Sequence, residues 1–298
     1  MQKPLVTVFV ITYNSNDYII EALESVKLQT YPNIELVVTD DNSRDNTVEL
    51  VKEWMANNKQ YFKNIVLVTS PVNTGVALNC NRGVKASSGK WLKVLAGDDK
   101  LPFNSIEDYV NFFESNPDYN IVFGKLRFYG NNKELTNEIK NLYEQKLYPK
   151  IKTDLKNQYR YNLVKLSVPG PGLMFSRELY DEVGGFDEKY PTGEEHPFTI
   201  YLLEKNYHIG FLDKVVYCYN VRENSLGKGS HYIKKDIADF FYDYRIKKLK
   251  KEKLYLELFY LKSHFDIYNR KPQNFIKKIP FIINYFIARK ILSHFISI

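Results

Sequence analysis

Two adjacent carboxylates, Asp98 and Asp99, close the hydrophobic run 90–97 and stand just before Lys100. A strand rich in Val and Leu that ends in paired acids places both side chains at the mouth of a sheet, where open α/β folds bind ligands. Two like charges this close repel each other and require a counter-cation. Because Mg²⁺-type ions bind one or two carboxylates together with phosphate oxygens, the pair predicts a divalent metal shared with a phosphate-containing substrate. An isolated pair is more simply explained as a solvated turn.

A second acidic pair, Asp40 and Asp41, follows the apolar run 34–39 in the same way. The turn-forming residues Asn42 and Ser43 come next, so an Asx-type turn with a helix cap is one explanation. We expect Asp40 to stabilise this turn and Asp41 to bind a ligand. Because two strands end in acids, these side chains are predicted to cluster at the C-terminal edge of one sheet.

The elements that position these acids alternate along the first hundred residues. Short β-branched runs predict strands at 5–11, 34–39, 65–69 and 91–96. Between them, apolar residues at helical spacing indicate helices, among them 75–87. Strand–helix alternation at this short period predicts a parallel sheet with helices on both faces.

A series of short motifs runs in order along the chain. On the N-terminal side they are VITYN (10–14), QTYP (29–32), VTDDNS (38–43), DNT (45–47), NTG (73–75), NRG (81–83), GKW (89–91) and GDD (97–99). A second block contains PGPG (169–172), GGFD (184–187), EE (194–195) and NS (224–225). Each motif is weak by itself, but together and in this order they resemble the family 2 glycosyltransferases of the GT-A fold. The resemblance covers about residues 4–226.

This resemblance implies an α/β protein with the GT-A nucleotide-sugar-binding fold, a mostly parallel mixed sheet flanked by helices, plus a C-terminal helical appendage. The glycosyltransferase domain would span 1–230, with a donor half at about 1–130 and an acceptor half at about 131–230. The Lys-, Asn- and Tyr-rich stretch 131–165 breaks the strand–helix pattern and is expected to shape the acceptor site. Residues 231–298 would form a basic, aromatic-rich helical tail.

Roles in donor binding follow from the same resemblance, position by position. Asp41 would accept a hydrogen bond from the imide edge of a uracil-like base, since a carboxylate is an acceptor for a ring N–H. Thr12 and Tyr13 would line the base pocket. The other residues implied in donor binding are Asn14, Asn81 and Arg82.

The metal and diphosphate site is implied at the second acidic pair. Asp98 would lie near the ribose, and Asp99 would bind the Mn²⁺ or Mg²⁺ that bridges the diphosphate. The family usually reads acid–any–acid–acid here, but this chain has Ala96 in the first position, so metal binding rests on Asp98 and Asp99. Arg222 stands where relatives often carry His; it cannot ligate a metal, but it can clamp phosphate.

Glu194 and Glu195 form the third acidic pair and open a helix predicted from apolar positions after residue 196. An acid at a helix N-terminus also complements the helix dipole, which explains at least one of the two. In the family this position reads Glu-Asp and the second acid is the general base, so the resemblance implies Glu195 as base and Glu194 as the alternative. The loop 169–172 is expected to bring backbone close to a sugar, or to be a simple turn.

The basic charge is concentrated in the tail. Residues 234–298 hold 15 Lys+Arg and 6 Asp+Glu, a net of +9, which leaves −2 for residues 1–233 because the whole chain carries +7. Basic residues mixed with Ile and Phe on predicted helices favour binding to an anionic membrane surface. The alternatives are helices packed on the domain or a homodimer. We expect no nucleic-acid binding, because no recognition motif accompanies the charge.

The sequence therefore predicts an inverting, metal-dependent glycosyltransferase that moves sugar from a nucleotide sugar, most simply a UDP-sugar, to a glycan or lipid-linked oligosaccharide. The transferred group would be a hexose or an N-acetylhexosamine. We expect a cytoplasmic protein at the inner face of the cell membrane, because residues 1–4 lead directly into the first strand without a leader. The alternatives are a non-catalytic nucleotide-sugar-binding subunit of a polysaccharide assembly complex and a sugar-phosphate nucleotidyltransferase.

Overall fold

One mixed sheet organises the protein. The computed structural model describes residues 3–164, 168–222 and 240–269, and within them seven strands pair in the order β3-β2-β1-β4-β6-β5-β7. The strands are β1 (Val6–Thr12), β2 (Ile34–Asp40), β3 (Asn64–Thr69), β4 (Trp91–Ala96), β5 (Ile121–Tyr129), β6 (Leu173–Ser176) and β7 (Gly210–Asn220). The predicted strands 5–11, 34–39, 65–69 and 91–96 correspond to β1–β4.

Most strand pairs in this sheet are parallel. β1 lies between β2 and β4 and pairs in parallel with both, while β2 pairs with β3 and β5 with β7 in the same sense. β6 is antiparallel to β4 and β5. Almost every residue of β1 and β2 is buried, as expected for parallel strands that helices cover on both faces. The prediction of a mostly parallel mixed sheet is confirmed.

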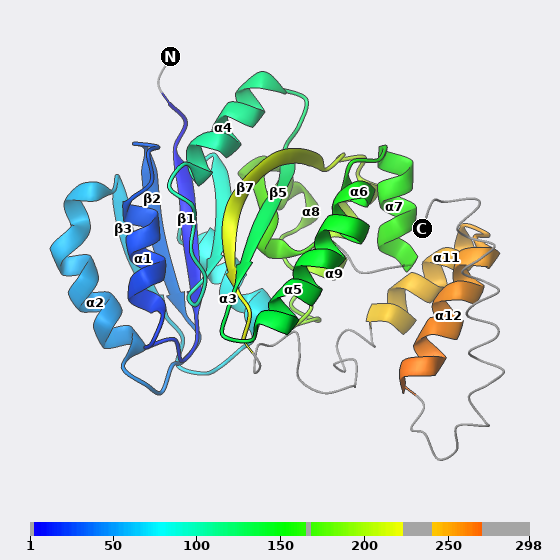
Figure 1. Cartoon of the computed structure of the whole chain (residues 1–298), viewed down its shortest axis with the longest axis horizontal. Coiled ribbons are helices and arrows are strands. Elements are labelled where there is room, and N and C mark those ends of the chain that lie inside the picture. The colour runs from blue at the N-terminus through cyan, green and yellow to red at the C-terminus, as the bar shows by residue number, and fades with distance from the viewer. Residues whose placement is uncertain (1–2, 165–167, 223–239, 270–298) are drawn as a thin grey trace.

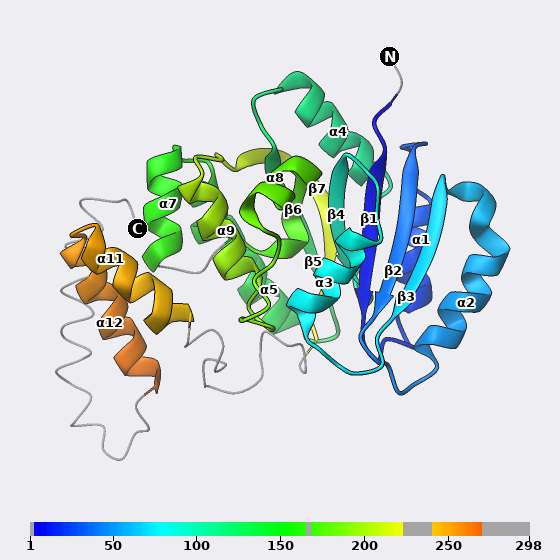
Figure 2. The same ribbon diagram turned by 180° about the vertical axis from the view of Figure 1, so that it is seen from behind.

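Helices cover both faces of the sheet: α1 and α5 lie in front of it in Figure 1, and α3 and α8 in front of it in Figure 2. In α1 the buried residues Ile19, Ala22, Leu23 and Val26 follow helical spacing and form the face turned to the core. The helices are α1 (Ile19–Lys27), α2 (Thr47–Asn58), α3 (Val76–Lys85), α4 (Ser105–Ser115), α5 (Lys133–Leu142), α6 (Tyr148–Ile151), α7 (Leu155–Val164), α8 (Arg177–Val183), α9 (Glu195–Glu204), α11 (Lys247–Lys251) and α12 (Tyr255–Asn269). Short helical turns are η1 (Lys59–Tyr61), η2 (Tyr143–Leu147), η3 (Gly170–Gly172) and η4 (Phe241–Ile246).

The stretch 131–165, which interrupts the strand–helix pattern, is helical in its described part. α5, η2 and α6 follow one another without a break, and α7 comes after a short turn. Tyr143 of η2 packs edge-on against Phe128 of β5, with ring centroids 4.8 Å apart. The Tyr148 hydroxyl accepts a hydrogen bond from the Leu126 amide at 3.0 Å. These contacts hold the segment against β5.

The described part of the tail packs on the body of the protein. η4, α11 and α12 lie beside α7 and α9, at the end of the molecule far from α2 (Figure 1). Their shared apolar cluster contains Leu163, Tyr190, Ile200, Phe240, Ile246, Leu249 and Leu261. Ion pairs add to it: Arg160 Nε lies 2.9 Å from Glu257 Oε1, and Lys248 Nζ lies 2.6 Å from Glu204 Oε1. Residues 240–269 thus share a core with the acceptor half, and the predicted boundary at 230/231 stays a prediction.

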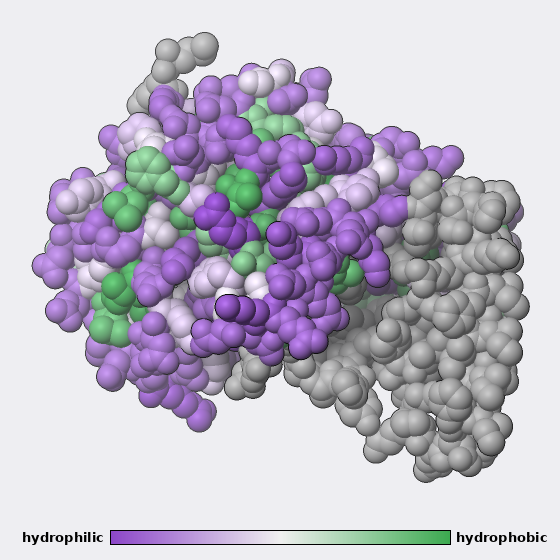
Figure 3. Space-filling model, viewed as in Figure 1, coloured by the Kyte–Doolittle hydropathy of each residue, from purple (hydrophilic) through white to green (hydrophobic). Residues whose placement is uncertain are grey.

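The face shown in Figure 3 is mostly hydrophilic, and its hydrophobic side chains gather in small, separate areas. Among the helices within the described ranges, none is long and apolar enough to cross a membrane.

Candidate functional site

The order of the central strands brings the first two acidic pairs together. β2 and β4 flank β1, and all three strands run in the same direction, so Asp40–Asp41 and Asp98–Asp99 leave the sheet at one edge. The chain stays in register beyond the strands, because the Asp41 amide donates to the Thr12 carbonyl at 3.0 Å. Thr12 consequently lies between the two acidic pairs.

Thr12, Tyr13 and Asn14 form the centre of this edge. Thr12 is buried, and its Oγ1 has no hydrogen-bond partner within the described residues. Tyr13 is 44% exposed, so its ring is open to a ligand. Asn14 has a φ of +51°, a left-handed conformation that Asn tolerates, and its side chain accepts from the Arg44 amide at 2.8 Å. A buried hydroxyl without a partner beside an exposed ring is suited to binding a polar, planar ligand.

Asp41 is buried and holds the loop that leads into α3. It accepts hydrogen bonds from the backbone amides of Thr74 and Gly75, at 2.9 and 2.8 Å, and from Arg82 Nη2 at 2.5 Å. Gly75 has a φ of +90°, and a Cβ there would lie 2.8 Å from Pro191 Cβ, so the turn requires glycine. Binding of a nucleotide base by Asp41 remains a prediction. The structure shows in addition that Asp41 holds the loop before α3.

Asp40 and Asn81, which the sequence also singles out, make hydrogen bonds within the protein. Asp40 accepts from the Ser43 amide at 2.9 Å, which is the turn that the sequence predicts. Asn81 accepts from the Tyr180 hydroxyl at 2.6 Å and donates to the Phe186 carbonyl at 2.9 Å. Asn81 therefore ties α3 to the turn after α8, and a part in donor binding stays a prediction.

Asp98 forms an ion pair with Arg222, which follows β7. The Arg222 guanidinium also lies over the Tyr18 ring, 5.1 Å from its centroid. Both side chains are partly exposed. A guanidinium held beside a carboxylate at the ligand edge can exchange that partner for a phosphate.

Asp99 is almost fully buried and is oriented by β7. The Tyr217 hydroxyl donates to it at 2.8 Å, and the Asn220 amide donates at 2.7 Å. Burial, and then the negative charge of Asp98, raise the pKa of Asp99, while these two hydrogen bonds and Arg222 oppose the rise. Tyr217 and Asn220 were not singled out by sequence reasoning, since nothing local marks them as partners of a residue more than a hundred positions earlier.

The chemistry of this donor set fits a hard divalent cation. Asp98 and Asp99 are adjacent carboxylates, and their mutual repulsion is relieved by a positive charge. No group of three or more His, Cys, Asp or Glu side chains suited to a metal occurs among residues 3–164, 168–222 and 240–269. Two carboxylates with open positions for substrate phosphate are what Mg²⁺-type ions accept.

Lys93, on β4, is a further residue of this site that sequence reasoning missed. It is fully buried, donates to the Leu173 carbonyl at 3.0 Å and to the Pro171 carbonyl, and lies 4.7 Å from the Tyr217 ring centroid. Burial lowers the pKa of Lys93 well below its ordinary value. The only local signal is a charged residue inside an apolar strand. Lys93 fixes η3, the predicted tight loop, against β4.

η3 is also packed closely against β5. A Cβ on Gly172 would collide with the Phe123 ring, so the backbone approaches the sheet as only glycine permits. Nearby, the Tyr109 hydroxyl donates to the Gly172 carbonyl at 2.7 Å. These contacts hold the loop against β5, and its approach to a sugar stays a prediction.

Glu194 and Glu195 lie at the start of α9, with Glu194 at the N-cap position. His196 Nε2 lies 3.8 Å from Glu195 Oε1. Burial raises the pKa of Tyr219 to about 12, helped by the charges of Asp99, Asp98 and Glu195. The charges of Glu195 and of the Asp98–Asp99 pair thus act on the same side chain of β7.

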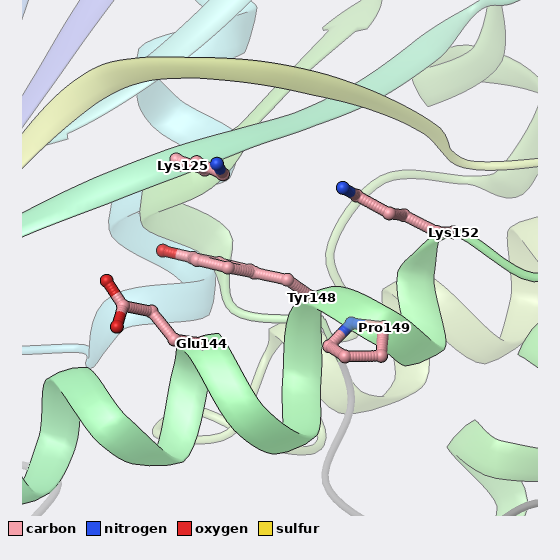
Figure 4. A pocket seen from close by; sticks show the side chains of 5 residues that line it. All are labelled: Lys125, Glu144, Tyr148, Pro149 and Lys152. Carbon is pink, nitrogen blue, oxygen red and sulfur yellow. The ribbon is translucent and has the colours of Figure 1, made fainter.

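Two cavities lie elsewhere. One of about 290 Å³ is lined by Lys125, Glu144, Tyr148, Pro149 and Lys152, which belong to β5 and the segment η2–α6 (Figure 4). The other, of about 360 Å³, includes His208 and Asp213. Asp213 forms ion pairs with Lys125 and, at 3.0 Å, with Lys152. Asp213 is thus shared by two lysines, and neither cavity is lined by the acids of the sheet edge.

Solved structures share the fold. The chain superposes on Staphylococcus aureus TarS 1-349 in complex with UDP-GlcNAc with a TM-score of 0.63 and 21% identity, covering 95% of this chain and 79% of that one. For the mannosyltransferase PcManGT from Pyrobaculum calidifontis, in complex with GDP-Man and Mn²⁺, the TM-score is 0.55 and the identity 17%, with 96% and 87% coverage. In another TarS structure the chain spans 43% of the protein.

Sequence relatives point the same way. The chain is 25% identical over 232 residues to MJ1057, an uncharacterized glycosyltransferase of Methanocaldococcus jannaschii, covering 76% of this chain and 75% of the relative. Residues 7–184 match the Glycosyl transferase family 2 domain, which is more than half of the 298 residues. The acids that the ordered motifs predict in a donor site lie at one edge of a sheet with the GT-A fold. The chain belongs to glycosyl transferase family 2, the nucleotide-sugar-dependent glycosyltransferases.

Proposed function

We propose that this glycosyltransferase moves a sugar with inversion from a UDP-sugar to a hydroxyl of a glycan or lipid-linked oligosaccharide, with Mn²⁺ or Mg²⁺ at the diphosphate. One observation carries the proposal. Asp98 and Asp99 follow β4 at the edge of the sheet, where Arg222 pairs with Asp98. The negative charges of these two residues and of Glu195 all act on Tyr219 and help to raise its pKa. A diphosphate site on one side and a carboxylate on the other is the arrangement that direct displacement at a sugar carbon needs.

The base of the donor would lie against Tyr13, with the Thr12 hydroxyl as its polar contact. Tyr13 offers an exposed ring, and Thr12 Oγ1 lacks a partner within the described part of the chain. Asp41 already accepts from Thr74, Gly75 and Arg82. A carboxylate accepts about four hydrogen bonds, so a ring N–H would share Asp41 with these donors or take the place of Arg82.

Asp98 and Asp99 would hold the divalent ion, and Arg222 would contact the diphosphate. When bound, such an ion neutralises negative charge that develops on the departing diphosphate. Tyr217 and the Asn220 amide keep Asp99 in one orientation. Arg222 gives up its contact with Asp98 and donates to phosphate oxygens instead, which is a charge-assisted hydrogen bond of the same kind.

Glu195 would take the proton of the acceptor hydroxyl. The hydroxyl oxygen forms a bond to the anomeric carbon as the bond from that carbon to the diphosphate oxygen breaks. The bonding electron pair leaves with the nucleoside diphosphate, and the proton moves to a Glu195 carboxylate oxygen. Because the oxygen attacks from the side opposite the leaving group, the anomeric configuration inverts.

A thermal-shift screen of UDP, GDP and other nucleoside diphosphates, with and without Mn²⁺, tests the donor assignment. UDP with Mn²⁺ should raise the melting temperature most, since a ligand that binds only the folded state stabilises it by mass action. Stabilisation by GDP but not UDP would move the assignment to a guanosine donor.

A hydrolysis assay with several UDP-sugars separates the enzyme from the alternatives. An active transferase slowly transfers the sugar of a UDP-sugar to water and so releases UDP. A non-catalytic binding subunit binds the UDP-sugar without releasing UDP. A nucleotidyltransferase would instead form nucleotide sugar from sugar phosphate and nucleoside triphosphate. The chain has Thr12, Tyr13 and Asn14 at the end of its first strand, where such enzymes need a Gly-rich phosphate loop with a basic residue.

A further inference from the structure

Asn81, on α3, has a side chain whose hydrogen-bonding capacity is completely used. Its Oδ1 accepts from the Tyr180 hydroxyl at 2.6 Å and from the Phe186 amide at 3.0 Å. Its Nδ2 donates to the Phe186 carbonyl and to Glu188 Oε1, both at 2.9 Å. A carboxamide has two acceptor lone pairs and two N–H donors, so these four bonds leave none of them for a bound ligand.

The segment that Asn81 binds is the turn after α8. Gly184 and Gly185 have φ values of +84° and +78°, a left-handed conformation that glycine adopts readily. A Cβ on Gly185 would lie 2.7 Å from the Tyr180 hydroxyl oxygen and 3.3 Å from Asn81 Oδ1, so the backbone passes close to both side chains. The Asn81 amide pairs with both backbone groups of Phe186, its N–H and its C=O. Asn81 therefore fixes the place of this turn against α3.

A second contact holds the same segment against the start of α3. The Ala77 amide donates to the Pro191 carbonyl at 3.2 Å. Pro191 stands three residues before Glu194 and four before Glu195. Because the segment is held at Phe186 and again at Pro191, α3 sets the path of the chain that leads into α9.

The Phe186 side chain extends this placement to α9. Its ring packs against Phe198 of α9 with centroids 4.7 Å apart, and both rings are buried. The next residue, Asp187, accepts a hydrogen bond from the Tyr201 hydroxyl of α9 at 3.1 Å. α8 and α9 lie side by side in Figure 2. Continuous contacts therefore join α3 to the helix that begins at Glu195.

The neighbouring residue of α3, Arg82, serves the donor side. Its Nη1 donates to the Thr74 hydroxyl at 2.8 Å, and its Nη2 pairs with Asp41. Asp41 is the acid predicted to bind the nucleotide base. Adjacent residues of one helix thus hold the donor acid and the segment that leads to the proposed base.

We propose that Asn81 is a positioning residue and not a ligand of the donor: through the turn at Phe186 it keeps the start of α9, and with it Glu195, at a fixed place relative to the donor half. The inference rests on the proposed role of Glu195 as base. It makes α3 the element that sets the position of the proposed base relative to Asp41.

The test compares turnover and UDP affinity in the full chain, Asn81→Ala and Asn81→Asp. Turnover is the kcat of UDP release from the UDP-sugar that is active in the hydrolysis assay, and affinity comes from calorimetric titration of UDP with Mn²⁺. Without the two bonds to Phe186 the start of α9 can shift, and a displacement of about 1 Å costs about 10²-fold in rate. We therefore expect kcat to fall by about 10²-fold in Asn81→Ala, with UDP affinity unchanged. Asn81→Asp keeps the acceptors for Tyr180 and Phe186 but loses both donors, so its kcat should fall less.

Gln29→Ala is the matched control, because the Gln29 amide also joins distant segments. Its Nε2 donates to the Pro102 carbonyl at 2.8 Å, and its Oε1 accepts from the Ile106 amide at 3.0 Å. The control variant should lower the melting temperature, as Asn81→Ala does, and leave kcat unchanged.

A lower UDP affinity in folded Asn81→Ala would make Asn81 a ligand of the donor and overturn the proposal. An unchanged kcat in that variant, or an equal fall of kcat in Gln29→Ala, would overturn it as well. If Asn81→Ala does not fold, Asn81→Asp gives the same comparison. Failure of the proposed function looks different, because the unaltered chain would then release no UDP, or Glu195→Gln would release it at the normal rate.

Discussion

At the scale of single residues, the site depends on carboxylates whose surroundings differ. Asp99 is buried under Tyr217 and Asn220, Asp98 faces Arg222, and Glu195 begins a helix. In the proposed function, the first two would bind a cation beside a diphosphate, and the third would accept a proton. The proposal thus gives different chemistry to the same functional group in three different environments.

Asp99→Asn keeps the shape of the side chain but removes its charge. We expect it to abolish transfer and the Mn²⁺-dependent part of UDP binding while the protein stays folded, because a neutral amide is a poor ligand for a hard cation. Calorimetric titration of UDP with and without Mn²⁺ measures this, with the exposed Asp213→Asn as control. Unchanged Mn²⁺-dependent affinity in folded Asp99→Asn would remove Asp99 from the metal site.

Glu195→Gln keeps the size of the side chain but cannot take a proton. Turnover should fall by about 10²–10⁴, the usual effect of losing a general base, and UDP affinity should be retained. Glu194→Gln is the matched control at the neighbouring position and should be nearly normal. If the Glu194 variant is the inactive one, the base is one residue earlier than proposed.

At the scale of elements, β4 links the two halves of the site. Asp98 and Asp99 follow its end, while Lys93 in its middle holds η3 through the Leu173 and Pro171 carbonyls. The same lysine lies beside Tyr217, which orients Asp99. A single strand thus positions the acids, the tight loop and the partner of Asp99.

Lys93→Met removes the ammonium group and leaves two buried carbonyls without their donor. Each lost partner costs about 1–3 kcal/mol, so the free energy of unfolding should fall by at least that amount. Urea unfolding measures the loss, and Lys90→Met, at an exposed lysine before the same strand, should change stability little. Equal stability of the Lys93 and Lys90 variants would mean that η3 is held by packing alone.

At the scale of the whole molecule, the tail has two parts. Residues 240–269 share the apolar cluster with α7 and α9. Residues 270–298 lie outside the described residues and contain six Lys+Arg and no Asp+Glu. The sequence predicts a membrane contact through 234–298. We propose that the segment after 269 makes this contact.

Two truncations test this division. Ending the chain after Lys235 should cause early melting or aggregation, because it exposes the apolar surface that Phe240, Leu249 and Leu261 cover. Ending it after Asn269 should leave the melting temperature nearly unchanged and lower the binding to anionic vesicles, which salt should weaken in the full chain. Vesicle co-sedimentation at low and high salt measures the second effect. No binding of the full chain at low salt would leave packing or dimerisation as the role of the tail.

The edge of the sheet at which Asp40–Asp41 and Asp98–Asp99 lie was predictable, because the patterns that mark it are local in the sequence. The β-branched runs that became β1–β4 each end beside their polar residues, and short motifs such as 38–43 and 97–99 mark those ends. Since parallel strands expose their carboxyl ends at one edge, the location of Asp41 and Asp98 at the same edge of the sheet followed from the sequence. Glu195 at the start of a helix was likewise a local pattern.

Only the tertiary structure decided which distant residues surround these acids. Tyr217 reaches Asp99 because Cys218 of β7 forms a bridge with Lys100, directly after Asp99, although β6 and β5 lie between β4 and β7 in the sheet. Lys93 reaches η3 because β6 returns antiparallel beside β4. Strand and helix periods describe neighbours within one element, whereas pairings across 80 and 118 residues depend on how elements pack, and no local pattern records that.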